Sequence, residues 1–223
     1  GSTFNDGTCA YPDNGDYALN FDGFDDWIEI PSSSTLDING NELSIIIKTK
    51  VNGEPSMSGV PCDHTSLFSK TNNQSPYGGF GIISNEAQSK WGFSIASQEF
   101  NSWNEIYANE SFSLNNYQTL AATFNGNTGY AKLYLDGNLS NEQFLFTGSI
   151  RSITDVINIG KNPQQSDFCY FNGNIKEIIV YTAEISEQDI NQYDENILEF
   201  EEEIVAHYKF NSGDGDILYD HSG

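Results

Sequence analysis

The sequence has few basic residues, and this scarcity limits what the protein can bind. Lysine and arginine together number 9 against 32 acidic residues, so the formal net charge is −23. A surface of this sign repels phosphate and sulfate, which makes nucleic acid a poor partner and means that a sulfated glycan would need a bridging cation. Apart from residues 199–203, the acids are scattered along the chain. We interpret the excess as a solubility feature of an extracellular protein, with a specific acidic docking face as the alternative.

Long apolar runs and disorder-promoting compositions are also missing. No run of eighteen apolar residues occurs, so no membrane span is predicted, and no signal peptide is recognisable. The chain has one methionine and six prolines, whereas 15 phenylalanines, 12 tyrosines and 3 tryptophans can fill a core. A length of 223 residues suits one large β-domain with short flanking segments.

Catalytic motifs are not found. The sequence has no nucleophile elbow, no glycine-rich phosphate loop and no pair of metal-binding histidines at helical spacing. Glu105 and Glu110 are the nearest approach to a glycosidase pair, but acids five residues apart in a strand face opposite sides. We therefore predict that the protein is not an enzyme.

What the sequence does contain is strand-type alternation broken by glycine and asparagine. Alternating or β-branched stretches are followed at short intervals by turn residues, as in antiparallel all-β domains. We expect strands at 17–22, 26–30, 43–51, 66–70, 78–83, 91–96, 117–125, 130–135, 156–160 and 170–181. A turn is predicted at Asp136-Gly137, and a short polar helix is predicted from Ser186 to Ile190.

Several of these pieces resemble one known family in their order. The opening Ala18-Leu-Asn-Phe-Asp-Gly23, followed by an acidic pair and Trp27, resembles the start of laminin-G-like modules. Strands 66–69, 156–160 and 174–181 continue the resemblance, while Tyr117-Gln118 stands where such modules usually carry Trp-His. The resemblance implies a concanavalin A-like, pentraxin-related fold, which is a two-sheet antiparallel jelly-roll sandwich.

The resemblance also divides the chain. Residues 1–16 form a lead-in, residues 17–191 form the laminin-G-like jelly roll, and residues 192–203 read as an acidic helix or linker. Residues 204–223 resemble the lead-in strand of a following module, which implies a fragment of a longer protein with flanking modules. The alternative is that this tail folds back and completes the sheet of its own module.

Calcium binding is implied by the same relatives. Hard cations bind carboxylate and carbonyl oxygens, and the loops that match the pentraxin double-calcium site lack its carboxylates. A different corner, made of Asp22, Asp25 and Asp26 with Glu177 across the sheet, is the predicted site for Ca²⁺. The alternatives are that these aspartates only shape a turn, or that Lys176 supplies the positive charge.

Carbohydrate binding in such modules relies on exposed aromatic rings with amides and carboxylates beside them. Trp103 lies in a polar stretch, with Asn101, Asn104 and Glu105 beside it, and is the first candidate. Tyr77 and Trp91 complete the predicted carbohydrate site, although any single aromatic is also explained by packing. Trp27 is expected in the core or on a sheet face.

The three cysteines fit no zinc or redox motif because no two of them are close in sequence. They allow three single bridges with one thiol left over. Cys62 and Cys169 both lie in polar loops that lead into core strands, so we predict this disulfide, with three free thiols as the alternative.

Together these observations predict a non-catalytic, lectin-like module of a larger secreted or cell-surface protein. Its expected partner is a glycan or cell-surface polysaccharide. The alternatives are a structural or adhesive spacer that contacts protein partners, and a degenerate glycoside hydrolase or lyase.

Overall fold

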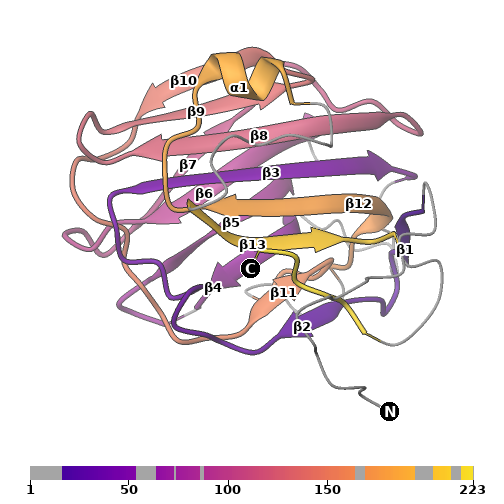
Figure 1. Cartoon of the computed structure of the whole chain (residues 1–223), viewed down its shortest axis with the longest axis horizontal. Helices are drawn as coiled ribbons and strands as arrows, with labels where there is room; N and C mark the ends of the chain where they lie inside the picture. The colour runs from indigo at the N-terminus through magenta and orange to yellow at the C-terminus, as the bar shows by residue number, and fades with distance from the viewer. Residues whose placement is uncertain are drawn as a thin grey trace, which may run out of the picture.

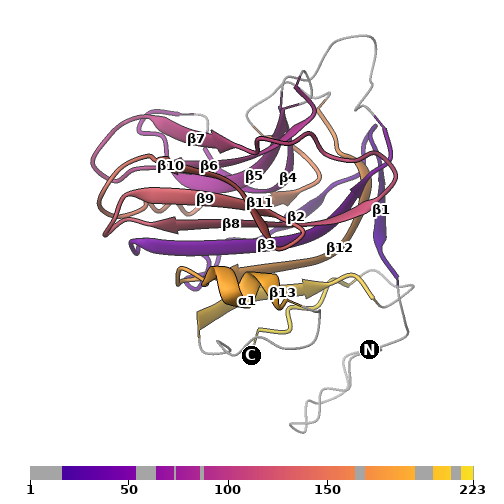
Figure 2. The same cartoon turned by 90° about the horizontal axis from the view of Figure 1, so that it is seen from above.

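The chain forms two antiparallel β-sheets stacked face to face, as the computed structural model in Figures 1 and 2 shows. The structure describes residues 17–53, 64–72, 74–85, 88–163, 169–193, 203–211 and 217–222. The prediction of an all-β, two-sheet sandwich is confirmed. Within the described residues, no helix is long and apolar enough to cross a membrane.

One sheet has seven strands. Its path runs in the order β1 (Leu19–Asp22), β12 (Asn172–Tyr181), β3 (Glu42–Val51), β8 (Tyr117–Asn125), β9 (Tyr130–Leu135) and β10 (Asn138–Phe144), and β13 (Ile204–Lys209) also pairs with β12. The predicted turn between β9 and β10 is confirmed, because Asp136 and Gly137 both have positive φ, at 48° and 79°. Such angles suit a two-residue hairpin connection.

The second sheet has six strands. Its order is β2 (Ile28–Ile30), β11 (Ile157–Ile159), β4 (His64–Thr71), β5 (Gly79–Asn85), β6 (Lys90–Ala96) and β7 (Trp103–Tyr107). β7 is an edge strand, hydrogen-bonded to β6 only on this path.

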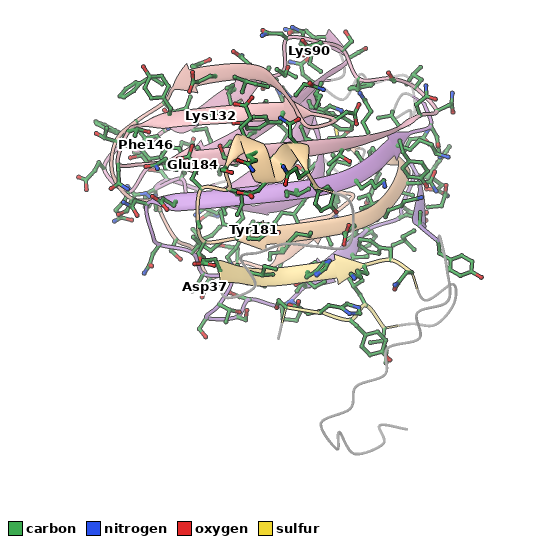
Figure 3. All side chains as sticks on the ribbon, turned by 45° about the horizontal axis from the view of Figure 1, so that its top comes forward. Asp37, Lys90, Lys132, Phe146, Tyr181 and Glu184 are labelled. Atoms are coloured by element: carbon green, nitrogen blue, oxygen red, sulfur yellow. The ribbon has the colours of Figure 1, made fainter. Side chains whose placement is uncertain are left out.

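The core lies between the sheets, and the period-two pattern of the strands fills it. In β3, Ile45 and Ile47 belong to this core, whereas Ile46 points to the opposite face. On that opposite face, Ile46 belongs to a second cluster that includes Ile190 of the short helix α1 (Glu187–Asn191). Figure 3 shows α1 lying over the seven-stranded sheet.

Two contacts fix α1 and the segment before it. The Ser186 hydroxyl accepts a hydrogen bond from the Asp189 backbone N–H at 3.2 Å and caps the helix, as expected for serine at this position. Lys132 Nζ lies 2.9 Å from a Glu184 carboxylate oxygen, and these two labelled side chains are neighbours in Figure 3. The predicted short helix is therefore present, one residue further along the chain than expected.

The C-terminal strand corrects one expectation. β13 pairs antiparallel with β12 of the same module, with Ile178 opposite Tyr208. Ala206, Tyr208 and Phe210 are buried in the main core. The strand in residues 204–223 therefore completes the sheet of its own module, which is the alternative that the sequence left open.

Cys169 is buried and disulfide-bonded. The alternative of three free thiols is therefore wrong. Cys9 and Cys62 lie outside the described residues, so the pairing with Cys62 stays a prediction. Asn162 donates to the main-chain oxygens of both Cys169 and His64, at 3.4 and 3.0 Å, so Cys169 lies close to the start of β4.

Candidate functional site

The edge strand β7 carries aromatic and acidic side chains on the outer face of the six-stranded sheet. Ile106 is fully buried in the core, so alternation along the strand turns Trp103, Glu105 and Tyr107 away from the core. Trp103 is half-buried, and its indole Nε1 is buried without a hydrogen-bond partner. The structure therefore places the first-choice aromatic at a sheet edge and not in the interior.

Tyr77 lies next to Trp103. The two ring centroids are 6.4 Å apart and the planes are tilted by 41°. Asn101 holds this arrangement, because its Oδ1 accepts from the Tyr77 backbone N at 2.9 Å and its Nδ2 donates to Ser75 Oγ at 2.7 Å. The two predicted aromatics thus form one cluster, while the Asn101 amide is engaged within the protein and not turned to a ligand.

The other two predicted polar residues differ from each other. Asn104 Nδ2 donates to the main-chain oxygens of Ile95 and Ser102 at 3.4 and 3.3 Å, so this amide also serves the fold. Glu105 is exposed and accepts a hydrogen bond from the Tyr107 hydroxyl at 2.6 Å. Burial, then the hydrogen bond to Glu105 and its charge, raise the pKa of the Tyr107 phenol, which stays a neutral donor. Glu105 is thus the predicted polar residue that faces solvent.

Trp91 was predicted as a further carbohydrate-binding aromatic, and this is wrong. Its side chain is fully buried in the main core, and its ring centroid lies 5.0 Å from that of Phe112. The alternation of β6 buries Trp91 together with Phe93 and Ile95. No face of this ring is accessible to a sugar.

Trp27 is exposed, contrary to the expectation of a core or sheet-packed residue. Its side chain is 45% accessible, and it follows the turn between β1 and β2. Lys161 Nζ lies 4.7 Å from the centre of its ring, and Tyr170 packs beside it at 6.0 Å. Trp27 is therefore a second surface aromatic, with one side occupied by a cation.

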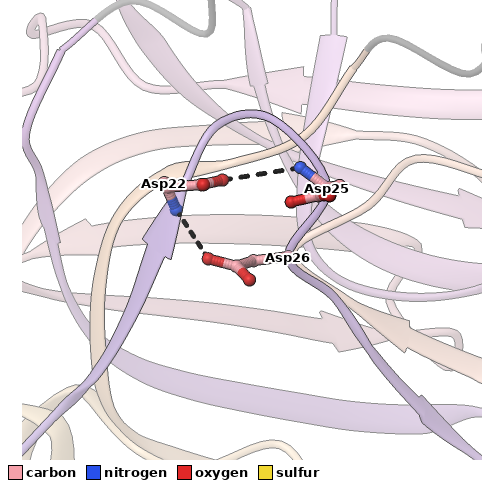
Figure 4. Close-up of side chains that lie close together, drawn as sticks. All are labelled: Asp22, Asp25 and Asp26. Carbon is pink, nitrogen blue, oxygen red and sulfur yellow. Dashed lines mark hydrogen bonds between the residues drawn. The ribbon is translucent and has the colours of Figure 1, made fainter.

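Asp22, Asp25 and Asp26 lie together, as Figure 4 shows. Each offers a carboxylate oxygen, and these oxygens all lie within 4.8 Å of one another. Two of the acids also shape the turn: Asp22 Oδ1 accepts from the backbone N of Phe24 at 2.7 Å, and Asp26 Oδ2 accepts from that of Asp22 at 3.0 Å. The remaining oxygens are of the type that calcium binds, so the three aspartates fit the predicted corner.

Glu177 does not belong to this corner, which corrects the predicted metal set. It lies five positions along β12 from Asn172, the register partner of Asp22, so it is roughly 16 Å away by the rise of a strand. Its buried carboxylate instead lies 2.6 Å from His207 Nε2 and accepts from the Tyr193 hydroxyl. Burial and then the Glu177 charge raise the pKa of the Tyr193 phenol. Glu177 thus joins the C-terminal strand to the sheet.

Comparison with known proteins gives a family-level match. The sequence profile of the Concanavalin A-like lectin/glucanases superfamily matches residues 21–191. No curated protein matches the chain.

Solved structures with the same architecture come from several bacteria. A provisionally assigned carbohydrate-binding protein from Bacteroides ovatus is 14% identical with a TM-score of 0.70, over 92% of this chain and 55% of that protein. CBM40 of the Ruminococcus gnavus IT-sialidase, bound to α2,3-sialyllactose, is 15% identical (TM-score 0.56; 75% and 96% covered). Domain 4 of the Geobacillus stearothermophilus arabinanase AbnA, in complex with arabinotriose, is 15% identical (TM-score 0.57; 78% and 75% covered).

Because all three identities are low, these likenesses establish the fold alone. The chain spans about half the length of the Bacteroides protein.

Proposed function

The chain belongs to the concanavalin A-like lectin/glucanases superfamily, and from this premise we propose that it is a non-catalytic carbohydrate-binding module. One observation carries the proposal: Trp103 and Tyr77 form an aromatic cluster at a sheet edge, with the exposed carboxylate of Glu105 on the same strand. Aromatic rings can bury the apolar face of a sugar, and a carboxylate accepts hydrogen bonds from its hydroxyls. Two of the similar structures are complexes with oligosaccharides, which supports the same function.

A non-catalytic role fits the spacing of acids on the outer face of the six-stranded sheet. Glu29 and Glu105 occupy one continuous row across the strands, separated by Asn158, Ser69, Gly81 and Ser94. Five inter-strand steps place these two carboxylates roughly 24 Å apart. Glycosidases hold their two carboxyl groups about 5–9.5 Å apart, so this pair cannot act on one glycosidic bond.

We further propose that the module belongs to a larger secreted or cell-surface protein. The strong acid excess and the disulfide-bonded Cys169 fit an oxidising, extracellular setting.

A glycan array probed with the wild-type protein, with and without calcium, tests the proposed function. For a glycan that binds, Trp103→Ala should weaken affinity by roughly 1–3 kcal/mol, because exposed aromatic anchors dominate such contacts. Titration calorimetry with the same glycan measures this difference.

Tyr130→Ala is the matched control. Tyr130 is also an exposed strand aromatic paired with another ring, Phe144, but it lies on the seven-stranded sheet. Its removal should leave affinity unchanged. Loss of binding on Trp27→Ala with full binding by Trp103→Ala would move the site to the β1–β2 turn. An array with no bound glycan would refute carbohydrate binding and favour the adhesive spacer.

A further inference from the structure

On the outer face of the six-stranded sheet, β7 carries an aromatic side chain at each of its two ends, Trp103 at the first and Tyr107 at the last. Tyr107 lies four positions along β7 from Trp103, so the Cα atoms of the two residues are roughly 13 Å apart along the strand. The Tyr107 ring lies across Gly92, where an added Cβ would meet it at 2.7 Å. The same ring stacks on His64, with centroids 6.3 Å apart and planes 26° apart. Glycine at position 92 is therefore what allows the ring to lie flat on the sheet.

Between these two ends, the face is lined by residues without long side chains. The register places Ser94, Gly81 and Ser69 in one row beside Glu105. These positions point away from the core, because their strand neighbours, such as Phe93, are core residues. Ser94 is only 6% accessible and Ser69 only 1%, so their neighbours cover these two side chains, whereas Glu105 at the β7 end of the row is exposed.

Polar atoms without a partner are concentrated on this face. In the described part of the chain, seven buried side-chain nitrogen or oxygen atoms have no hydrogen-bond partner. Four of them belong to residues that the strand register turns to the outer face: Ser69 Oγ, His64 Nδ1, Thr71 Oγ1 and Trp103 Nε1. Buried polar groups are rarely left unpaired in native proteins. These four atoms are themselves buried, so a ligand on this face meets the exposed groups beside them, of which Glu105 is the polar one on β7.

The charge of this face restricts the class of sugar that it can bind. The acid at the β7 end of the row is the exposed Glu105, and the row ends on β2 at a second exposed acid, Glu29. Arg151, near the Trp103 end, donates its guanidinium to the main-chain oxygens of Ser97 and Gln98. With a net charge of −23, such a face repels carboxylate-bearing sugars.

We propose that this face binds a neutral, linear oligosaccharide laid along β7, with one sugar on Trp103 and Tyr77, another on Tyr107, and the sugar between them beside Glu105. The exposed Glu105 carboxylate accepts hydroxyl hydrogen bonds in the middle. This inference rests on the proposed carbohydrate-binding function. It adds the charge class of the ligand, its minimum length and the Tyr107 end of the site.

The test has a ligand arm and a variant arm. Neutral oligosaccharides of increasing length, their monosaccharides, lactose and α2,3-sialyllactose are titrated into the wild-type protein. We expect at least one neutral oligosaccharide to bind at least tenfold more tightly than its monosaccharide, and lactose to bind no worse than its sialylated form. Glu105→Ala, which removes the acceptor between the two aromatic ends, should lower affinity for that oligosaccharide at least tenfold while the melting temperature stays almost unchanged, because Glu105 is exposed.

Tyr107→Ala should lower affinity by a similar factor, and Tyr130→Ala should not. Tighter binding of the sialylated sugar, equal binding of the monosaccharide, or wild-type affinity in both Glu105→Ala and Tyr107→Ala would overturn the inference and leave carbohydrate binding standing. Absence of binding to every glycan would refute the proposed function itself.

Discussion

Trp91 and Trp103 lie on neighbouring strands and have opposite environments. Both follow polar residues in the sequence, so residue type alone does not separate them. The difference comes from the face of the sheet: Trp91 alternates in phase with Phe93 and Ile95, whereas Trp103 is out of phase with Ile106. The phase of β6 is readable from the sequence, and it argues against a binding role for Trp91. The phase of β7 is not readable, because Ile106 is its only aliphatic residue.

The two tryptophans should therefore respond differently to truncation. Trp91→Ala leaves a large hole between the sheets and should lower the free energy of unfolding by about 3–5 kcal/mol. Trp103→Ala should cost less, because that side chain is already partly exposed. Urea unfolding followed by tyrosine fluorescence measures both. Equal losses would mean that Trp103 is a packing residue and not a surface platform.

The aspartate corner yields a metal prediction. If Asp22, Asp25 and Asp26 bind calcium, adding calcium to metal-stripped protein should raise the melting temperature, since a ligand of the native state stabilises it by mass action. Asp25→Asn should reduce that rise. Identical melting curves with calcium and with chelator would show that the three acids only shape the turn. Lys176 Nζ lies 4.4 Å from the ring centre of Tyr117, so the cation that the sequence offered as an alternative has an aromatic contact of its own.

At the scale of elements, alternation predicted most strands but not all. The stretches at 43–51, 66–70, 78–83 and 91–96 correspond to β3, β4, β5 and β6. β7 and β10 were missed for the same physical reason. Both are edge strands in which few side chains reach the core, so their polar sequences carry no apolar period. Since β7 bears Trp103, Glu105 and Tyr107, missing it hid the Tyr107 end of the site. A search for strands in which aromatic and acidic residues occupy alternate positions would have found β7.

The C-terminal strand gives a prediction about stability. Deleting residues 204–223 removes Tyr208 and Phe210 from the core, which should cost about 3–6 kcal/mol for these two side chains. It also leaves Glu177 without its histidine partner. Thermal unfolding of the truncated and full chains measures the loss. An unchanged melting temperature would show that this segment does not stabilise the module.

An ion pair between a buried lysine and a partly exposed aspartate gives a prediction about pH. Lys70 of β4 is 1% accessible, and its Nζ lies 2.7 Å from Asp37, in the segment between β2 and β3. Burial acts to raise the pKa of Asp37, but hydrogen bonds from Lys70 and Ser32 and the charge of Lys70 lower it overall. Because the folded-state pKa lies below the unfolded value of about 3.9, this contribution is complete above that pH and is lost as the pH falls through the folded-state pKa.

Asp37→Asn should therefore destabilise the protein at neutral pH, and its difference from wild type should shrink as the solution is acidified below about pH 4. Urea midpoints across this range measure the trend. The exposed Glu29→Gln serves as the control and should track the wild type. A difference that persists unchanged at low pH would mean that Asp37 acts through packing and not through its charge.

The molecule combines a mostly apolar interior, in which Lys70 and Glu177 are the buried charged residues of the described part, with a strong excess of acidic residues. Family and sandwich architecture followed from the sequence, because they depend on local period and on the order of motifs. The course of the C-terminal strand and the partners of Glu177 did not follow. They depend on which strands become neighbours in the sheet, and a local pattern does not encode that choice.

The net charge of −23 makes its own prediction about the molecule as a whole. Like charges on a compact domain repel one another and destabilise it, and salt reduces this repulsion by shortening the screening length from about 30 Å at 0.01 M to about 3 Å at 1 M. The melting temperature should therefore rise as sodium chloride is added over this range. Affinity for a neutral oligosaccharide should stay constant, because its binding neutralises no charge. Calorimetry and titration in the same buffers separate the two effects. A melting temperature that falls with salt would mean that attractive ion pairs such as Lys70–Asp37 and Lys132–Glu184 outweigh the repulsion among the acids.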